Sequence, residues 1–463
     1  MLISPREALA WFKAVWERAR VQRLSRQQLE AEQAAKFRSL VRLACERSPF
    51  YRAIIQERSL DVDRCRPTDF PILTKQTVAD NFDRLLTDRR LSRSRIEQFL
   101  TESRDPGELL DGRYHVLHSS GTSGTIGHMA YSHDDWIKGA TQMLRVFPLR
   151  LRSRVAFVGA TRGHFAGASL LLTGNYKTNR LFFDVQAHDV SQPMDQIVAA
   201  LNQLQPHVLT GYASVLERLA EPQEEGTLRI APRLVVSGAE PLRPGCRSIL
   251  QDAFRAPVVN AYASSEHLFM AFTLPGSDGM HLLEDDLIFE LHDDFTCVTN
   301  LLNRTLPLIR YRMDDVLIPE SDPLGRYPFT KIRDLVGRSE DSLVFINREG
   351  EKDFIHPSLI GELVVPGLKS WQIQLIDDTS FAFNARFEAG RNPREKQVIR
   401  GQIRERLRAM LAEKRMDNVD FQIAEVDRLK LDLVSGKTRM ILQPERQDSP
   451  DSRCGQTAVL VRS

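Results

Sequence analysis

Apolar residues in the first part of the chain recur at the spacing of an α-helix. Residues 8–20 show this period, and residues 27–45 repeat it before Ser48 and Pro49 interrupt the pattern. Apolar side chains three and four positions apart share one face of a helix, so each run can bury one side against a core. The sequence therefore predicts a helical lead-in over residues 1–100.

The period changes from residue 155 onward, where strand-like runs alternate with helical ones. The expected strands are 155–159, 181–183, 207–210, 233–237 and 257–260, with helices expected at 167–172, 213–220 and 244–254. Repeated strand–helix units build largely parallel sheets flanked by helices, so we predict an α/β fold. In such sheets ligands bind where the carboxyl ends of strands meet loops. The loops at 211–212, 238–240 and 262–266 fall at such ends.

Beyond residue 284 the pattern consists of short strands, which predicts a β-subdomain. The expected strands are 287–290, 297–299 and 307–316. After a charged stretch at 333–341, short strands surround one long helix, Pro393 to Glu413, and a strand-like run follows at 419–426. We therefore predict a large N-terminal domain over residues 1–337 and a small, mobile α+β lid domain over residues 338–463.

Composition narrows the class of partner. The 463 residues carry a formal net charge of +2, which argues against a nucleic-acid binder and favours a small-molecule substrate. The cysteines are scattered without a CxxC pair, which indicates neither a zinc site nor a disulfide framework: Cys45, Cys65, Cys246, Cys297 and Cys454. Without an apolar run of membrane-spanning length, we expect a cytoplasmic protein. A basic face between Arg18 and Arg26 could touch a membrane, but a solvated helix surface is the favoured interpretation, so no membrane partner is expected.

Seven small residues in a row form the most informative segment: Ser119, Ser120, Gly121, Thr122, Ser123, Gly124 and Thr125. Glycines let backbone N–H groups turn toward an anion, and the hydroxyls add donors. Strand-like runs at 114–117 and 129–131 predict that this segment is a hairpin loop. No lysine stands where a Walker loop requires one, so the segment is either a different phosphate loop or a flexible linker.

Three further segments carry candidate chemistry. Residues 262–266 offer an aromatic ring, hydroxyls and a carboxylate, which could hold a base, a phosphate and Mg²⁺; the alternative is a strand-end turn. Asp315 ends a β-run and could accept ribose hydroxyls, or it could lie in a solvated turn. Lys437 on a glycine-containing turn could offset charge between a carboxylate and a phosphate, although most lysines are merely solvated.

Together these segments resemble the adenylate-forming acyl ligases, the superfamily of acyl-CoA synthetases, luciferases and adenylation domains, and within it the phenylacetate-CoA ligase branch. The resemblance covers residues from about 100 to 440. It rests on seven motifs in order: SSGTSGT at 119–125, GYASVLERLA at 211–220, SGAEPL at 237–242, YASSE at 262–266, PLIRYRMDD at 307–315, VGRSED at 336–341 and SGKTR at 435–439. PILTK at 71–75 is similar to that branch as well.

The resemblance implies a role for each matching position. Residues 119–125 would hold the β- and γ-phosphates of ATP. Around the nucleoside it implies Gly238, Ala239 and Glu240 beside the adenine, Tyr262 stacked on it, Asp315 on the ribose and Arg338 near them. For the chemistry it implies Ser265 at the α-phosphate, Glu266 at Mg²⁺, Glu340 as the hinge and Lys437 as the catalytic lysine of the mobile domain. Two positions depart from the family pattern, because Ala263 and Asp314 stand where glycine is usual.

The acyl pocket is expected at the start of the small-residue helix. Its candidate lining residues are His164, Phe165, Ala166, Gly167 and Tyr212. His164 is also a candidate catalytic residue that approaches the substrate carboxylate or ring; the alternative is a histidine bonded to a neighbouring carbonyl group. Small side chains leave room for a planar acid, so we favour an aryl or arylacetic substrate.

The expected reaction is ATP-dependent adenylation of a carboxylic acid with Mg²⁺, followed by thioester formation, with CoA as the favoured acceptor. Three alternatives stay open: transfer of the acyl group to a carrier protein or an amine, transfer of the adenylyl group itself, and a nucleotide-sensing protein without activity. A homodimer is compatible with the sequence.

Overall fold

The structure is a computed structural model. It describes residues 5–103, 105–118, 127–147, 152–161, 163–172, 183–190, 192, 194–274, 277, 279–322, 325–333, 343–350, 352–355, 365–413, 415–430 and 441–442. Contacts divide the chain into two compact units, residues 1–340 with 431–438 and residues 341–430 with 439–463. We call them the large unit and the small unit.

The large unit begins with helices, as the apolar spacing predicts. They are α1 (Pro5–Val21), α2 (Arg26–Arg47), α3 (Pro49–Glu57), the 3₁₀ turn η1 (Pro67–Asp69), α4 (Lys75–Asp80), α5 (Phe82–Leu85) and α6 (Arg93–Glu102). Ser25 and Gln28 form a capping box at the start of α2. Ser48 ends α2 and caps α3, with Pro49 at the first helical position. The break in the apolar pattern is therefore a helix boundary.

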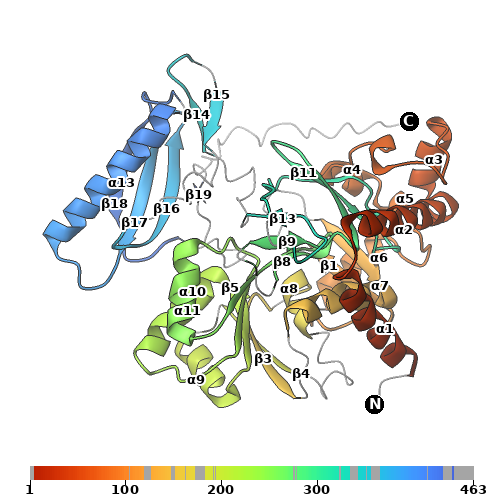
Figure 1. Cartoon of the computed structure of the whole chain (residues 1–463), viewed down its shortest axis with the longest axis horizontal. Helices are drawn as coiled ribbons and strands as arrows, with labels where there is room; N and C mark the ends of the chain where they lie inside the picture. Colours follow the sequence, from red (N-terminus) through yellow and green to blue (C-terminus); the bar gives the residue numbers. More distant parts are fainter. Residues whose placement is uncertain are drawn as a thin grey trace, which may run out of the picture. The chain divides into compact units, whose positions relative to one another are not determined.

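An eight-stranded sheet is the centre of the large unit (Figure 1). Its strands are β3 (Ser153–Gly159), β4 (Phe183–Asp189), β5 (Val208–Tyr212), β6 (Leu234–Gly238), β7 (Val258–Ser264), β8 (Leu268–Thr273), β9 (Met280–Leu282) and β13 (Lys331–Ile332). Their order is β13-β9-β8-β7-β6-β5-β3-β4. The five strands from β4 to β7 run parallel, and β8, β9 and β13 add antiparallel pairs. The predicted α/β class is confirmed as a mixed, mainly parallel sheet.

Helices cover the parallel part of this sheet. They are α8 (Ala166–Leu172), α9 (Met194–Leu204), α10 (Ala213–Glu224) and α11 (Pro244–Phe254). The helices α9, α10 and α11 lie on one side of the strands in Figure 1, and α8 lies on the other, where it also contacts β1 (Tyr114–His118). The sheet is apolar on both faces for this reason, and the strands read as continuous hydrophobic runs.

Smaller sheets complete the large unit. Strands β1 and β2 (His128–Ser132) form an antiparallel pair, and β2 leads into α7 (His133–Ala140) and the 3₁₀ turn η2 (Thr141–Arg145). A three-stranded antiparallel sheet holds β10 (Leu287–Leu291), β11 (Thr296–Asn300) and β12 (Tyr311–Met313). The α-helix α7 thus tightens into a 3₁₀ turn at its C-terminal end.

The expected strand at 307–316 was wrong in extent, because only β12 is extended. The preceding apolar residues, Leu306, Leu308 and Ile309, are buried in an irregular segment. There the Asn303 side-chain oxygen accepts the backbone N–H of Leu306 at 2.9 Å, and Arg310 has a φ of +55°. The apolar residues of this segment are therefore buried without forming a strand. The Asn303 side chain supplies a hydrogen bond that a neighbouring strand would otherwise supply.

The described residues of the small unit form two small sheets and one long helix. A hairpin pairs β14 (Leu343–Ile346) with β15 (Lys352–Ile355), and a four-stranded sheet has the order β18-β17-β16-β19. Its strands are β16 (Leu368–Asp377), β17 (Ser380–Phe387), β18 (Asp420–Glu425) and β19 (Ile441–Leu442). The helix α13 (Pro393–Glu413) connects the parallel strands β17 and β18 and packs Ile403 and Leu407 against the sheet residues Ile373 and Phe383.

A buried ionic cluster attaches the lead-in helices to the sheets. The side chains of Arg18 and Arg145 both contact Asp285, and Arg18 also contacts Asp286. Burial alone lowers the pKa of the Arg18 guanidinium, but the charges of Asp286 and Asp285 outweigh this effect, so its pKa is raised. The two carboxylates lie between β9 and β10, so the cluster fixes the connection between the two largest sheets of the unit.

Replacing Arg18 with Met tests this cluster. The substitution leaves Asp285 and Asp286 buried without one of their cations, which is expected to lower the free energy of unfolding by about 3–5 kcal/mol. The matched control is Arg42→Met, because Arg42 pairs with Asp63 at the surface, where both side chains are more than half exposed. The control should change stability by about 1 kcal/mol or less. Equal thermal unfolding midpoints for the two variants would contradict the assignment.

Candidate functional site

Three neighbouring parallel strands end at the same level of the main sheet. Tyr212 on β5 pairs with Gly238 on β6, and Gly238 pairs with Ala261 on β7. The segments that follow these residues therefore lie together along the carboxyl edge. This edge is where open α/β sheets bind ligands, and it brings together three of the segments singled out from the sequence.

Close backbone approach explains two residues at this edge. A Cβ on Gly211 would lie 2.4 Å from the carbonyl oxygen of Val158 on the neighbouring strand, so only glycine fits there. Ala239 has a φ of +64°, a left-handed conformation that is costly for a residue with a side chain. Such strain persists when surrounding structure imposes it and is concentrated at functional sites.

Glu240 has a local structural partner. Its Oε2 accepts the backbone N–H of Ser214 at 2.8 Å, in the first turn of α10. A carboxylate at the N-terminus of a helix is favoured by the unpaired N–H groups there. Glu240 therefore fixes the β6 loop against α10, beside the predicted position of the adenine.

Tyr262 and Asp315 form a direct hydrogen bond, in which the tyrosine hydroxyl donates to Asp315 Oδ2. Both residues are buried, and the tyrosine hydroxyl also lies 4.0 Å from the sulfur of Met313. Tyr262 belongs to β7 of the main sheet, whereas Asp315 follows β12 of the three-stranded sheet. The two residues expected to hold adenine and ribose thus meet across two sheets.

Ser265 and Glu266 follow β7 and are held mainly through their backbones. The Ser265 carbonyl accepts the Tyr131 hydroxyl at 2.7 Å, and the Glu266 carbonyl accepts the Asn300 side-chain amide at 3.1 Å. The Glu266 carboxylate accepts the Tyr311 hydroxyl at 3.4 Å. Both side chains are half-buried, so their polar groups reach the surface of the edge.

The end of β1 lies between two of these segments. The backbone N–H of His118 donates to the His164 carbonyl at 3.1 Å, and the His118 carbonyl accepts the Ser265 hydroxyl at 3.4 Å. His118 immediately precedes residues 119–125, so this strand end positions one stem of the predicted phosphate loop against the predicted α-phosphate residue. Sequence reasoning missed His118, because its partners are distant in sequence.

The expected acyl-pocket residues lie near this strand end. The His164 Nε2 is 3.1 Å from the Ser103 hydroxyl, its ring packs on Phe99, and it is almost fully buried. Burial lowers the pKa of His164. Its partner is thus a hydroxyl group, whereas the alternative interpretation expected a carbonyl.

Phe165 and Tyr212 approach the edge from two sides. The centroids of the Phe165 and His118 rings lie 4.4 Å apart. The Tyr212 hydroxyl accepts the Ala160 N–H at 3.1 Å. Ala166 and Gly167 form the first turn of α8, where a Cβ on Gly167 would lie 3.5 Å from the Phe157 ring. The pocket role stays a prediction for all five candidate residues: His164, Phe165, Ala166, Gly167 and Tyr212.

Several predicted site residues lie outside the described residues. They are the phosphate-loop residues 119–125, Arg338, the hinge residue Glu340 and Lys437. Within the described part of the chain, no group of three or more His, Cys, Asp or Glu side chains could hold a metal ion. The sequence assigns one described carboxylate, that of Glu266, to Mg²⁺.

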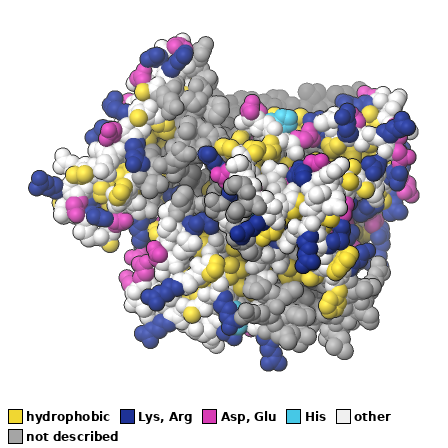
Figure 2. All heavy atoms as spheres, viewed as in Figure 1, with side chains coloured by type: hydrophobic (Ala, Val, Ile, Leu, Met, Phe, Trp, Pro, Cys, Tyr) yellow, Lys and Arg dark blue, Asp and Glu magenta, His cyan; other side chains and the backbone are white. Residues whose placement is uncertain are grey.

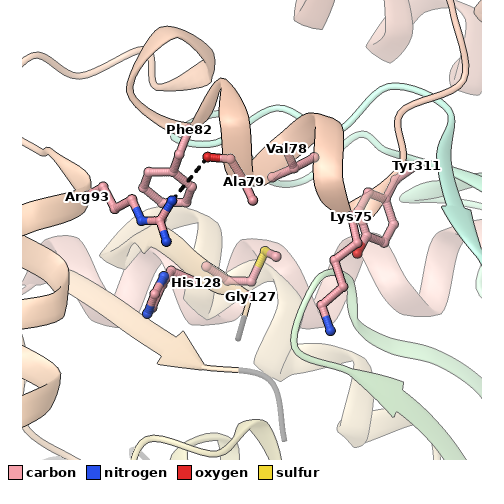
Figure 3. A pocket seen from close by; sticks show the side chains of 9 residues that line it. Lys75, Val78, Ala79, Phe82, Arg93, Gly127, His128 and Tyr311 are labelled. Atoms are coloured by element: carbon pink, nitrogen blue, oxygen red, sulfur yellow. Dashed lines mark hydrogen bonds between the residues drawn. The ribbon is translucent and has the colours of Figure 1, made fainter. Parts of the chain in front are cut away.

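A small pocket adds a lysine that sequence reasoning did not assign. Its volume is about 10 Å³, near that of one water molecule, and Lys75 and Tyr311 line it together with Gly127, the first described residue after the phosphate segment. Figure 3 shows the Lys75 side chain running beside Tyr311. The Tyr311 hydroxyl in turn contacts the Glu266 carboxylate. Lys75 is the last residue of the PILTK segment, so the sequence resemblance could have pointed to this lysine.

The two departures from the family pattern are accommodated locally. Ala263 lies in β7 and is not among the residues with positive φ, so its side chain causes no backbone strain. The Asp314 carboxylate lies 3.3 Å from Arg312 Nε, which offsets its charge beside the predicted ribose site. The pairing of β7 with β8 shifts register between Tyr262 and Ala263, so the strand is irregular at this position.

Residues 53–286 match the family described as AMP-binding enzyme, which is half of the chain. The chain belongs to this family. It is an adenylate-forming enzyme of the AMP-forming acid–thiol ligase type. The matched range contains residues 119–125, the three strand ends and Glu266, whereas Asp315, Arg338 and Lys437 lie beyond it.

Two curated relatives are distant. Protein CapK of Staphylococcus aureus is 22% identical over 330 residues, which cover 67% of this chain and 68% of CapK. Phenylacetate-coenzyme A ligase of Thermus thermophilus is 25% identical over 355 residues, which cover 69% of this chain and 73% of that enzyme. The predicted resemblance to the phenylacetate-CoA ligase branch is confirmed at this distance.

Solved structures support the fold. The 2-hydroxyisobutyryl-CoA ligase in complex with R3-HIB-AMP has a TM-score of 0.71 at 16% identity and covers 92% of this chain and 91% of its own. The anthranilate CoA ligase AuaEII in complex with anthranoyl-AMP has a TM-score of 0.51 at 14% identity and covers 70% of this chain and 65% of its own. At such identities the likeness shows a shared fold and leaves the substrate open.

Tyr262→Phe tests the junction between the two sheets. The variant keeps the ring but removes the donor to Asp315, so we expect a loss of about 1–3 kcal/mol in stability and several-fold weaker ATP binding by calorimetry. The matched control is Tyr114→Phe, which removes a 2.6 Å hydrogen bond from a tyrosine to Asp88 elsewhere in the large unit. The control should bind ATP as the wild type does. Unchanged ATP affinity in Tyr262→Phe would remove this bond from the nucleotide site.

His267 gives a test by acidification. Both ring nitrogens are buried without a partner among the described residues, and burial lowers the pKa of His267 to about 3. Below pH 6.5 His267 therefore becomes protonated in the unfolded chain but stays neutral in the folded chain. The free energy of unfolding thus keeps its full value above pH 6.5 and decreases as the pH falls from 6.5 to about 3. We expect a loss of about 2 kcal/mol at about pH 5 that His267→Phe reduces. Thermal unfolding midpoints at neutral pH and at this acidic pH measure it, and an equal decrease in both proteins would refute the assignment.

Proposed function

We propose that this enzyme adenylates a carboxylic acid with ATP and then passes the acyl group to a thiol, with CoA as the acceptor. The observation that carries the proposal is the Tyr262–Asp315 hydrogen bond at the carboxyl edge of the main sheet, next to Ser265 and Glu266. A ring, a carboxylate and hydroxyl donors at one strand end are the groups that a nucleoside phosphate requires. The family match and the phenylacetate-coenzyme A ligase relative support the same reaction class.

In the proposed arrangement, each side chain binds one part of ATP. Tyr262 stacks on the adenine, Asp315 accepts the ribose hydroxyls, and Ser265 donates to the α-phosphate. Gly238, Ala239 and Glu240 border the adenine. Residues 119–125 hold the β- and γ-phosphates. Lys75 adds positive charge beside the pocket that Gly127 and Tyr311 line. Arg338 lies near the ribose in this assignment.

Glu266 fits a magnesium ion by the chemistry of its donor. Its half-buried carboxylate offers hard oxygen ligands, of which one accepts the Tyr311 hydroxyl at 3.4 Å. Mg²⁺ bound there would neutralise charge on the phosphates while pyrophosphate leaves. The contribution of the chain itself is to orient this carboxylate, through the bond from Asn300 to the Glu266 carbonyl.

Lys437 completes the first half-reaction in this proposal. The substrate carboxylate attacks the α-phosphate, the bond to pyrophosphate breaks, and the lysine ammonium stabilises the negative charge that develops between the two reactants. Rotation of the predicted lid, residues 338–463, about Glu340 would then remove Lys437 and admit the thiol. The thiol sulfur attacks the acyl carbon, and AMP leaves with the electron pair of the broken acyl–phosphate bond.

The acid is proposed to be an aryl or arylacetic acid that lies between His118, Phe165 and Tyr212. Aromatic rings at 165 and 212 and small residues at 166 and 167 favour a planar group. His164 is bonded to Ser103, so its part in this pocket is to hold the start of α8 against α6 through that bond. A panel of aromatic, aliphatic and amino acids tests this choice.

Lys437→Ala tests the proposed chemistry. Acid-dependent exchange of labelled pyrophosphate into ATP should fall about 100-fold or more, while ATP binding stays nearly unchanged, because the lysine acts on the transition state. The matched control is Lys430→Ala, which removes an exposed lysine of the small unit and should leave exchange intact. Equal exchange in wild type and Lys437→Ala would overturn the assigned role.

The acceptor is tested in the same assay format. Release of AMP that requires CoA supports the proposal, whereas release that requires a holo carrier protein or an amine identifies the alternative acceptor. Label from ATP that stays on the product identifies adenylyl transfer. A chain without acid-dependent exchange under any condition would be a nucleotide-sensing protein.

A further inference from the structure

The first helix exposes two large aromatic side chains to solvent. Phe12 and Trp16 on α1 are 70% and 66% exposed, and they lie one helical turn apart on the same face. The opposite face of α1 is fixed to the large unit by buried Ala14, Arg18 and Val21. Because the helix is anchored by one face, the aromatic pair projects from a fixed support.

Basic residues lie close to the aromatic pair in the chain. Lys13 and Arg23 are exposed, and neither forms an ion pair within the described part of the chain. The Arg20 guanidinium lies 5.9 Å from the Trp16 ring and pairs with Glu32 of α2. We call Phe12, Lys13, Trp16, Arg20 and Arg23 the α1 patch. Figure 2 shows hydrophobic side chains beside Lys and Arg over the position that α1 has in Figure 1.

Among the described side chains, the acidic residues Glu17 and Glu32 beside the α1 patch each have a basic partner. Glu17 lies 3.5 Å from Lys36 of α2, and Glu32 accepts both terminal nitrogens of Arg20. Hydrogen bonds from Arg20 lower the pKa of Glu32, so this carboxylate is ionised and committed to its partner. Among the described side chains of the α1 patch, the charges left for an external partner are those of Lys13 and Arg23, and both are positive.

We propose that the α1 patch docks on an anionic lipid surface, with α1 lying in the interface plane. Helices that bind membranes in this way present Trp, Phe or Leu on one side with Lys and Arg beside them, and the amphipathic indole ring rests at the headgroup level. None of the described helices is long and apolar enough to cross a membrane, which fits attachment from one side. The proposal departs from the expectation, drawn from the sequence, of no membrane partner.

The charge of the patch favours lipid over a second copy of the chain. A symmetric dimer would place the same patch against itself and bring Lys13 and Arg23 toward their equivalents. Like charges brought together in this way oppose association. Anionic headgroups instead attract each basic residue near the surface, and the attraction decreases with salt.

Vesicle sedimentation with the full chain tests the proposal. The wild type should pellet with vesicles of phosphatidylcholine and phosphatidylglycerol but not with vesicles of phosphatidylcholine alone, and high salt should release it. Phe12→Ser/Trp16→Ser should abolish pelleting, and Lys13→Glu/Arg23→Glu should weaken it at least about tenfold. The matched control is Ile376→Ser/Val398→Ser, which removes two side chains of the small unit that are 49% and 58% exposed and should leave pelleting unchanged.

Three further measurements complete the test. Circular dichroism and pyrophosphate exchange should be the same in all variants, because the patch lies outside the proposed nucleotide site. A wild type that stays in the supernatant with every vesicle, or a Phe12→Ser/Trp16→Ser variant that still pellets, overturns the proposal. Light scattering gives a further contradicting result. If the wild type is a dimer and Phe12→Ser/Trp16→Ser is a monomer, the patch is an interface between copies of the chain and the proposal is overturned.

Discussion

The hydrogen bond between Tyr262 and Asp315 is the constraint on which the arrangement of the site depends. A buried carboxylate needs a partner, because its desolvation without one is costly. Tyr262 can supply that partner only while β7 of the main sheet and the segment after β12 of the three-stranded sheet stay aligned. The predicted adenine and ribose groups are therefore held in one geometry by a contact that also stabilises the fold.

The buried ionic cluster fixes the same two sheets at a second place. Asp285 and Asp286 lie on the connection from β9 to β10, and Arg18 reaches them from the lead-in. Lys36 of α2 bonds to Asp286 at 3.0 Å, so both long helices take part. The helices α1 and α2 thus stabilise the junction of the two sheets beside the proposed nucleotide site. Their sequence pattern alone does not indicate this role.

Local patterns predicted the elements and the edge on which the site lies. The strand ends at Tyr212 and Gly238 follow from strand–helix repeats, because parallel strands place their carboxyl ends together. Long-range partners could not be predicted in this way. Ser103 contacts His164 across 61 positions, and Glu240 reaches Ser214 rather than solvent. The irregular segment before β12 resembles a strand in sequence, because apolar residues signal burial without specifying backbone conformation.

The central claim is that ATP binds at the carboxyl edge of the main sheet between Tyr262 and Asp315. The most direct measurement is a crystal structure of the chain with AMP or an acyl-adenylate analogue. We expect the adenine to lie against the Tyr262 ring and the ribose hydroxyls to lie within hydrogen-bond distance of the Asp315 carboxylate. A nucleotide bound elsewhere, or a complex in which these two residues lie apart, would contradict it.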